Sequence, residues 1–134
     1  MKGFQLIEIP IKKDQRGNLA IIEQWKEIPF DIKRIFWIFD VAAGEQRAAH
    51  AHKELSQFIT GIAGSFRIEL DDGERKESVI MDSPGKGLLI SPGIWISLTD
   101  FSKDAVCLVV APGDYNENEY LKDYEEFLRW KRDV

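Results

Sequence analysis

The feature that most limits the possible folds is a succession of short apolar segments, which turn residues interrupt at short intervals. Residues 32–40 are rich in β-branched and aromatic side chains, which favour strands. Asp71-Asp72-Gly73 is typical of a tight hairpin turn, and Ser91-Pro92-Gly93 marks another. About ten such segments over residues 4–111, with no linker or repeat between them, predict one antiparallel all-β domain, either a sandwich or a barrel.

The period of the apolar residues changes near the C-terminus. Aromatic and aliphatic side chains recur there at helical spacing: Tyr120, Tyr124, Phe127 and Leu128. Asn116, followed by Glu119 three residues later, has the pattern of a capping box. We therefore expect an amphipathic helix over about residues 117–131, whose aromatic stripe packs on the barrel or on a partner subunit.

Length and composition exclude several classes of protein. A chain of 134 residues can bury one core, and 44% hydrophobic with 31% charged residues is ordinary for a folded globular chain. The net charge of −5 is spread without a basic block, which argues against nucleic acid as the main partner. No stretch reaches the ~18 apolar residues of a membrane helix, and the start lacks the apolar run of a signal peptide. We expect a cytoplasmic protein that does not contact a membrane.

Both histidines of the chain, His50 and His52, lie between Gly44 and Gly64 and are separated by one residue. In a strand their side chains point to the same face. Two titratable rings on one wall of a cavity form an acid/base site or half of a metal site. A lone histidine on a strand is often only a packed core residue, whereas two in register, preceded by Arg47 and bracketed by glycines, favour a function.

The spacing of these glycines and histidines resembles the first motif of the cupin family. Metal-binding cupins carry a glutamate where this chain has Gln57, and a third histidine where it has Ile96. Two imidazoles without a carboxylate or thiolate are too few ligands for a firm transition-metal site. We therefore expect no metal and no other cofactor, and general acid/base transfer near neutral pH as the chemistry. A metal-dependent cupin dioxygenase or isomerase is the disfavoured alternative.

A more specific resemblance covers nearly the whole chain. Short segments at residues 14–17, 28–30, 32–34, 38–40, 47–53, 70–73, 82–84, 100–102 and 114–117 resemble those of the nucleotide-sugar 3,4-ketoisomerases. That family is similar in fold to the dTDP-sugar 3,5-epimerases and acts on dTDP-4-keto-6-deoxyglucose. The resemblance implies an all-β cupin jelly-roll barrel with a C-terminal α-helix, as one domain over residues 1–134. It also implies a homodimer with exchanged N-terminal strands, and no need for a metal.

The resemblance implies an activity as well. Such an isomerase moves the keto group between C4 and C3 of a dTDP-linked 4-keto-6-deoxy sugar through an enediol, and its product feeds sugars of surface polysaccharides. By position, His50 would take the C3 proton, and His52 would be a second acid/base or orienting group. A guanidinium fork suits phosphate geometry, so arginines are expected to hold the pyrophosphate or sugar oxygens. The residues expected at the substrate are Arg16, Arg34, Arg47, Lys53, Phe36, Gln57, Trp95 and Ile96.

Two of these positions depart from the family's pattern. Phe36 stands where the family usually has a tyrosine, so a hydroxyl that could relay a proton is absent unless Tyr115, Tyr120 or another group replaces it. Ile96 stands where the family commonly has histidine or arginine, at a position linked to the configuration at C4. Both changes remove polar groups from the expected cavity. The alternative function is therefore a non-catalytic subunit that has lost activity and only binds a sugar nucleotide.

Overall fold

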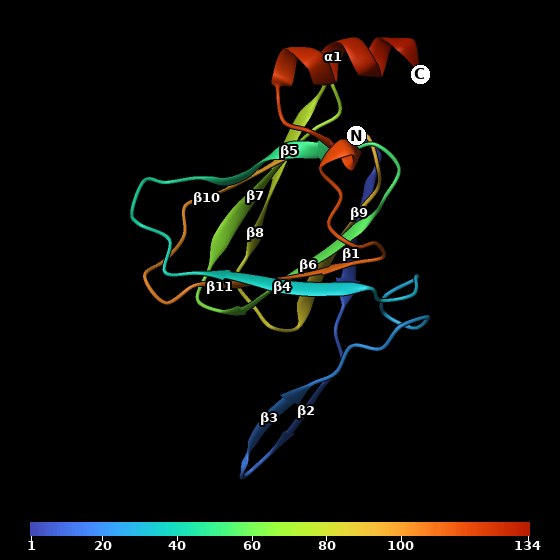
Figure 1. Ribbon diagram of the computed structural model, residues 1–134. Helices are drawn as coiled ribbons and strands as arrows, with labels where there is room; N and C mark the ends of the chain where they lie inside the picture. The colour runs from blue at the N-terminus through green and yellow to red at the C-terminus, as the bar shows by residue number, and fades with distance from the viewer.

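In the computed structural model, which describes residues 1–134, two five-stranded antiparallel sheets face each other and form a barrel (Figure 1). The first sheet contains, in spatial order, β1 (Phe4–Glu8), β9 (Lys86–Ile90), β6 (Gln57–Ala63), β11 (Val106–Ala111) and β4 (Arg34–Phe39). The second contains β12 (Tyr120–Leu121), β5 (Arg47–His52), β10 (Trp95–Thr99), β7 (Phe66–Asp71) and β8 (Lys76–Met81). The predicted all-β fold class is confirmed.

The core lies between the two sheets because apolar and polar residues alternate along the strands. On β7, Phe66, Ile68 and Leu70 are buried, while the side chains between them are at least partly exposed. The register with β10 pairs Ile96 with Leu70 and Leu98 with Ile68, so the apolar faces of neighbouring strands coincide. Each such fully buried side chain contributes about 1.5–3 kcal/mol.

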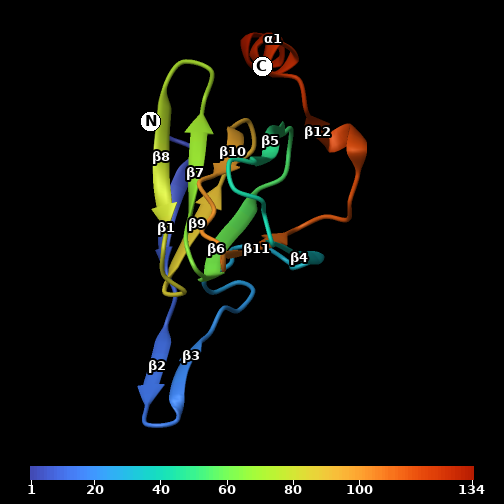
Figure 2. The same ribbon diagram turned by 90° about the vertical axis from the view of Figure 1, so that its left-hand side faces the viewer.

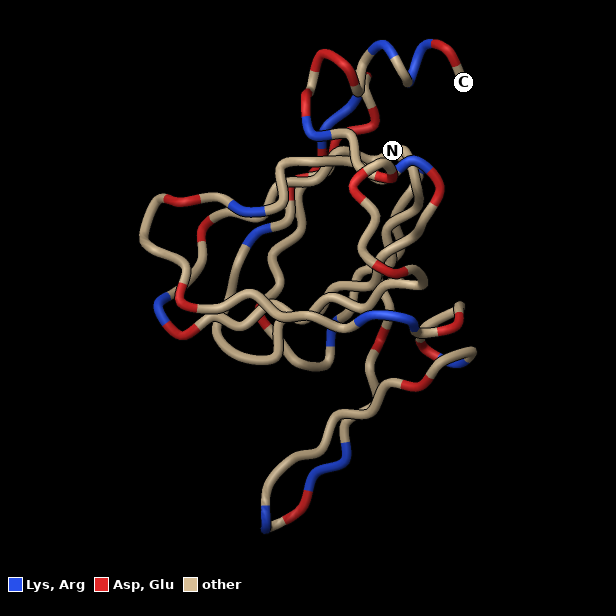
Figure 3. Tube along the Cα trace, in the orientation of Figure 1, with Lys and Arg blue, Asp and Glu red and all other residues tan.

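An N-terminal hairpin of β2 (Ile11–Asp14) and β3 (Gly17–Ala20) stands apart from both sheets and projects from the barrel (Figures 1 and 2). At its tip the Arg16 side chain donates a hydrogen bond of 2.8 Å to Asp14. Every residue of β3 is exposed. Acidic and basic residues are distributed over the loops, the hairpin and the C-terminal segment (Figure 3).

The C-terminal helix is shorter than the sequence pattern predicts. Residues 117–131 do not form one helix; instead a 3₁₀ turn, η1 (Glu117–Glu119), is followed by β12 and then by α1 (Tyr124–Asp133). Asn116 caps η1, not α1, by accepting a hydrogen bond of 3.0 Å from the Asn118 backbone. The chain then leaves helical geometry because Tyr120 and Leu121 pair with β5.

The apolar stripe of α1 packs on the outer face of the barrel, behind β5. Phe127 is fully buried in a cluster with Ala51 and Leu121. Trp95 of β10 and Tyr124 pack at its edge. No helix of the structure has the length and apolar character that crossing a membrane requires.

Candidate active site

A bulge in β5 decides which of its side chains face the interior. The ladder pairs Ile96 with His50 but Leu98 with Arg47, so two residues of β5 oppose one residue of β10. Ala48, inside the bulge, has a φ of 73°. Without the extra residue Arg47 and His50 would point to opposite faces of the sheet; with it, both line the same cavity.

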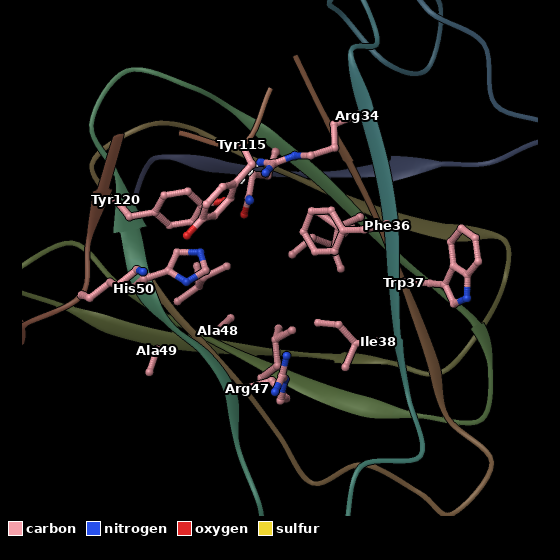
Figure 4. Close-up of a pocket in the computed structure, with 16 residues that line it drawn as sticks. Arg34, Phe36, Trp37, Ile38, Arg47, Ala48, Ala49, His50, Tyr115 and Tyr120 are labelled. Atoms are coloured by element: carbon pink, nitrogen blue, oxygen red, sulfur yellow. Dashed lines mark hydrogen bonds between the residues drawn. The ribbon is translucent and has the colours of Figure 1, made fainter. Parts of the chain in front are cut away.

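This cavity, of about 580 Å³, lies between the two sheets (Figure 4). Its charged and polar side chains are Arg34, Arg47, His50, Gln57, Tyr115, Tyr120 and Lys122. His50 and Tyr120 lie on one side, and Phe36 and Ile38 of β4 face them from the other. The wall is therefore mostly apolar with a few converging polar groups, which is typical of a small-molecule site.

His50 is the titratable group best placed to act on a ligand in this cavity. Its Nε2 atom is buried and has no hydrogen-bond partner in the protein. Burial, and to a smaller degree the neighbouring His52, lowers the pKa of His50 to about 4, although a hydrogen bond to the Ala48 backbone opposes the shift. Near pH 7 the imidazole is therefore neutral and can accept a proton.

His52 lies behind the cavity wall, not on it. Its side chain is 5% exposed, and its ring centroid is 5.2 Å from that of His50. Burial lowers the pKa of His52, while the nearby Glu119 carboxylate raises it. That carboxylate is held in place by backbone hydrogen bonds, including one of 2.8 Å from the Leu55 amide. The arrangement is that of a histidine oriented by a fixed anion.

Tyr120 joins the two histidines to the opposite sheet. It pairs with His52 in the β12–β5 ladder, and its ring centroid is 4.9 Å from that of His50 and 4.5 Å from that of His52. The Nη2 atom of Arg34, on β4, donates a hydrogen bond of 3.1 Å to the Tyr120 hydroxyl. The Arg34 guanidinium in turn lies over the Phe36 ring, 5.3 Å from its centroid.

Three cationic side chains reach the cavity: Arg34, Arg47 and Lys122. Only Lys122 has an acidic partner within ion-pair distance, the exposed Glu117 at 3.6 Å. The site therefore carries a net positive charge that suits an anionic ligand such as a pyrophosphate. The structure contains no group of three or more His, Cys, Asp and Glu side chains that could hold a metal ion.

The structure brings most of the expected site residues together. Those that line the cavity are His50, Arg34, Arg47, Phe36, Gln57 and Ile96. Four others lie elsewhere, and one of them is His52, which is buried behind the wall. Arg16 is at the tip of the projecting hairpin, and Lys53 follows β5, where its backbone amide donates to the Glu119 carbonyl. Trp95 is on the outer face under α1, because neighbours on a strand point to opposite faces and Ile96 points inward.

Two charged side chains of the site, Glu119 and Lys122, were not anticipated as site residues. The spacing of Glu119 from Asn116 indicates a helix cap, whereas its carboxylate turns toward His52. Lys122 gives no sequence signal, because a lysine in an amphipathic segment is usually a solvated surface charge. Only the pairing of β12 with β5 brings both residues to the site.

Comparisons with known proteins agree with this geometry. Residues 2–132 match the FdtA family model, described as WxcM-like, C-terminal. The TDP-4-oxo-6-deoxy-alpha-D-glucose-3,4-oxoisomerase of Aneurinibacillus thermoaerophilus is 43% identical over 117 residues, which are 87% of this chain and 84% of that protein.

Solved structures give the same result. A 3,4-ketoisomerase from Helicobacter canadensis is 44% identical, with 96% of this chain and 97% of that one covered and a TM-score of 0.93. A mutant of the 3,4-ketoisomerase QdtA from Thermoanaerobacterium thermosaccharolyticum, in complex with TDP-4-keto-6-deoxyglucose, is 31% identical, with 99% and 96% covered and a TM-score of 0.96. The resemblance expected from the sequence is confirmed, and the chain belongs to the nucleotide-sugar 3,4-ketoisomerase family of the cupin superfamily.

Proposed function

We propose that this protein is a 3,4-ketoisomerase of a dTDP-linked 4-keto-6-deoxy sugar and that His50 is its catalytic base. The observation that carries the proposal is the unpartnered Nε2 atom of His50 in a cavity with an excess of cationic side chains. A neutral imidazole suits removal of the proton on the carbon next to a ketone. The anionic pyrophosphate suits Arg34, Arg47 and Lys122.

The reaction needs no external oxidant or reductant. His50 takes the proton from C3, the electron pair of that C–H bond forms a C3–C4 double bond, and the carbonyl pair moves onto the oxygen at C4. Return of the proton to C4, with transfer of the hydroxyl proton from the oxygen at C3 to the oxygen at C4, gives the 3-keto product. The mostly apolar wall keeps water away from the enediol and strengthens each polar contact.

Ligand binding itself tunes the base. A pKa of about 4 makes His50 a weak base in the empty cavity. A bound pyrophosphate brings negative charge near the imidazole, which raises the pKa of His50 toward neutrality because an opposite charge favours the protonated form. His50 therefore becomes a competent base when the nucleotide sugar is in place.

The direct test is to incubate the protein with dTDP-4-keto-6-deoxyglucose in deuterated water and to follow the sugar by NMR. We expect a 3-keto product and deuterium at the exchanging carbons. His50→Asn should bind dTDP and stay folded but give no turnover. Absence of both product and C3 exchange in the wild type would remove the catalytic claim, and unfolding of His50→Asn would instead indicate a structural role for this residue.

A second candidate function is a sugar-nucleotide binding subunit without activity. Two cavity residues favour it: the buried Ile96, which pairs with His50, and Phe36, which faces His50 across the cavity, are both apolar. Titration calorimetry with dTDP separates the two functions when turnover is absent. Binding without turnover or exchange supports the subunit, whereas no binding excludes both.

We also propose a homodimer with exchanged N-terminal strands, acting in the cytoplasm in the synthesis of surface-polysaccharide sugars. Two observations support the exchange: a lone hairpin is at best marginally stable in water, and Leu19 on this one is 57% exposed. Exchange would carry Arg16 toward the partner's barrel, where it would serve the site. Light scattering should give twice the chain mass, and Arg16→Ala should then weaken dTDP-sugar binding; a monomer would contradict the exchange.

A further inference from the structure

We infer that the Tyr120 hydroxyl is a second catalytic group, which relays a proton between the two substrate oxygens. This inference rests on the proposed ketoisomerase function and adds to it. His50 accounts for the proton that moves from C3 to C4. Isomerisation also moves a proton from the oxygen at C3 to the oxygen at C4, and a group other than His50 must carry it.

The cavity wall offers few candidates for this transfer. Among the residues that line it, only Tyr115 and Tyr120 carry a side-chain hydroxyl. Phe36 has none, and His52 lies behind the wall. Tyr115 is 61% exposed, and no hydrogen bond fixes its hydroxyl.

The contact between Tyr120 and Arg34 prepares this hydroxyl for proton transfer. In the 3.1 Å hydrogen bond the guanidinium donates and the phenol oxygen accepts. The phenol hydrogen therefore stays free, and the structure gives it no acceptor in the protein. A guanidinium at this distance also stabilises the phenolate that exists between the two halves of the relay, because a charge-assisted hydrogen bond strengthens as the oxygen gains negative charge.

Tyr120 lies next to the proposed base, His50, as the relay requires. C3 and C4 are neighbouring carbons, so the group that serves their oxygens must lie next to the group that serves their hydrogen. The rings of Tyr120 and His50 are 4.9 Å apart and line the same cavity. Pairing of β12 with β5 fixes this arrangement in the backbone.

The steps balance as follows. While His50 takes the C3 proton, Tyr120 gives its hydroxyl proton to the oxygen at C4, which leaves an enediol, an imidazolium and a phenolate held by Arg34. The phenolate then takes the proton from the oxygen at C3, and that oxygen's electron pair forms the new carbonyl. The imidazolium returns its proton to C4, and both protein groups recover their starting states.

The test compares Tyr120→Phe with the control Tyr124→Phe, which removes a hydroxyl outside the cavity, where it donates to Asp71. Tyr115→Phe removes the other hydroxyl of the cavity and tests the rival assignment. We expect Tyr120→Phe to lower kcat by about 100-fold with little change in KM, because a positioned acid/base group contributes 10²–10⁴-fold. The Tyr124→Phe variant should keep kcat within about threefold of the wild type.

Deuterium exchange provides a readout that a structural role would not move. Without the relay the enediolate returns to substrate more often, so Tyr120→Phe should show more C3 exchange into recovered 4-keto sugar per molecule of product than the wild type.

Several outcomes would overturn the inference. If Tyr120→Phe keeps the wild-type kcat, another group carries the proton between the oxygens. If Tyr115→Phe instead shows the large loss of kcat, that group is Tyr115. An unchanged exchange-to-product ratio together with weaker dTDP binding would make Tyr120 a structural residue. These results differ from failure of the proposed function, in which the wild type itself forms no product.

Discussion

The Nδ1 atom of His52 lies 3.3 Å from the Oε2 atom of Glu119, and both side chains are almost completely buried. The carboxylate comes from η1, more than sixty residues later in the chain, and also accepts backbone hydrogen bonds from Glu54 and Leu55. Glu119 thus fastens the C-terminal segment to the end of β5 and orients the second histidine. We regard it as a positioning residue, because it does not line the cavity.

Glu119→Gln tests this role. The amide group would place a donor toward the His52 ring or the Leu55 amide, so we expect a loss of stability of about 1–3 kcal/mol. The pKa of His52 should fall further, because the carboxylate that raises it is gone. We expect kcat to drop about 10-fold, as for other groups that orient a functional imidazole. Histidine NMR titration, denaturation and kinetics measure the three effects.

Glu125→Gln is the matched control for this substitution. Glu125 lies in the first turn of α1 and is exposed, so the change removes the same charge without touching the site. Its activity and the His52 titration should equal those of the wild type. If both variants lose activity equally, general electrostatics explains the effect and the specific role of Glu119 is wrong.

The lowered pKa of His50 predicts acid sensitivity of the fold. Its value is about 4 in the folded protein, against 6.5 for a free histidine, so the unfolded state binds the proton more tightly. The contribution of His50 to the free energy of unfolding is therefore fully present above pH 6.5. It is lost as the pH falls toward 4, and this loss is at most roughly 3 kcal/mol. Denaturation at several pH values should show a shallower decline for His50→Asn. Equal slopes would mean that His50 is not desolvated.

Kinetics should reveal a different pKa with substrate bound. The acid limb of kcat/KM reports His50 in the free enzyme, whereas that of kcat reports it in the complex. Because the pyrophosphate raises the pKa of His50, the acid limb of kcat should lie at higher pH than that of kcat/KM. Superimposable limbs would indicate that the phosphates bind too far from the imidazole to act on it.

The sequence predicts the fold class and the common strand face of the two histidines, because both depend on local patterns, but of the two only His50 lines the cavity. Alternation identifies the strands, and a spacing of two puts His50 and His52 on one face. The same alternation requires Trp95 to point outward once Ile96 points inward, so the placement of Trp95 follows from the sequence when the two residues are considered together.

Other features depend on long-range pairing and leave no local signal. The bulge that turns Arg47 inward contains alanines, where a glycine would have indicated a positive φ. The pattern over residues 117–131 is helical throughout, yet pairing with β5 converts Tyr120 and Leu121 into a strand. Tertiary contacts override intrinsic propensity in this segment.

The bulge itself makes a testable prediction. Ala48 adopts a φ of 73°, which is strongly unfavourable for β-branched residues. Ala48→Val should therefore lower the free energy of unfolding by about 1–3 kcal/mol. Ala49→Val is the control, because its neighbouring position lacks a positive φ and valine favours extended backbone. If the two variants have the same free energy of unfolding, backbone strain at position 48 does not destabilise the protein.

The helix α1 supports the active site from outside the barrel. Phe127 is fully buried against Leu121, the residue that follows Tyr120 in β12. Phe127→Ala should cost about 3–5 kcal/mol through the cavity it leaves, and it should lower kcat because β12 loses its support. Arg129→Ala, on the exposed side of α1, should change neither quantity. The Phe127→Ala variant could instead be less stable but keep the wild-type kcat at a temperature where it is folded. That result would show that β12 holds Tyr120 in place without the helix.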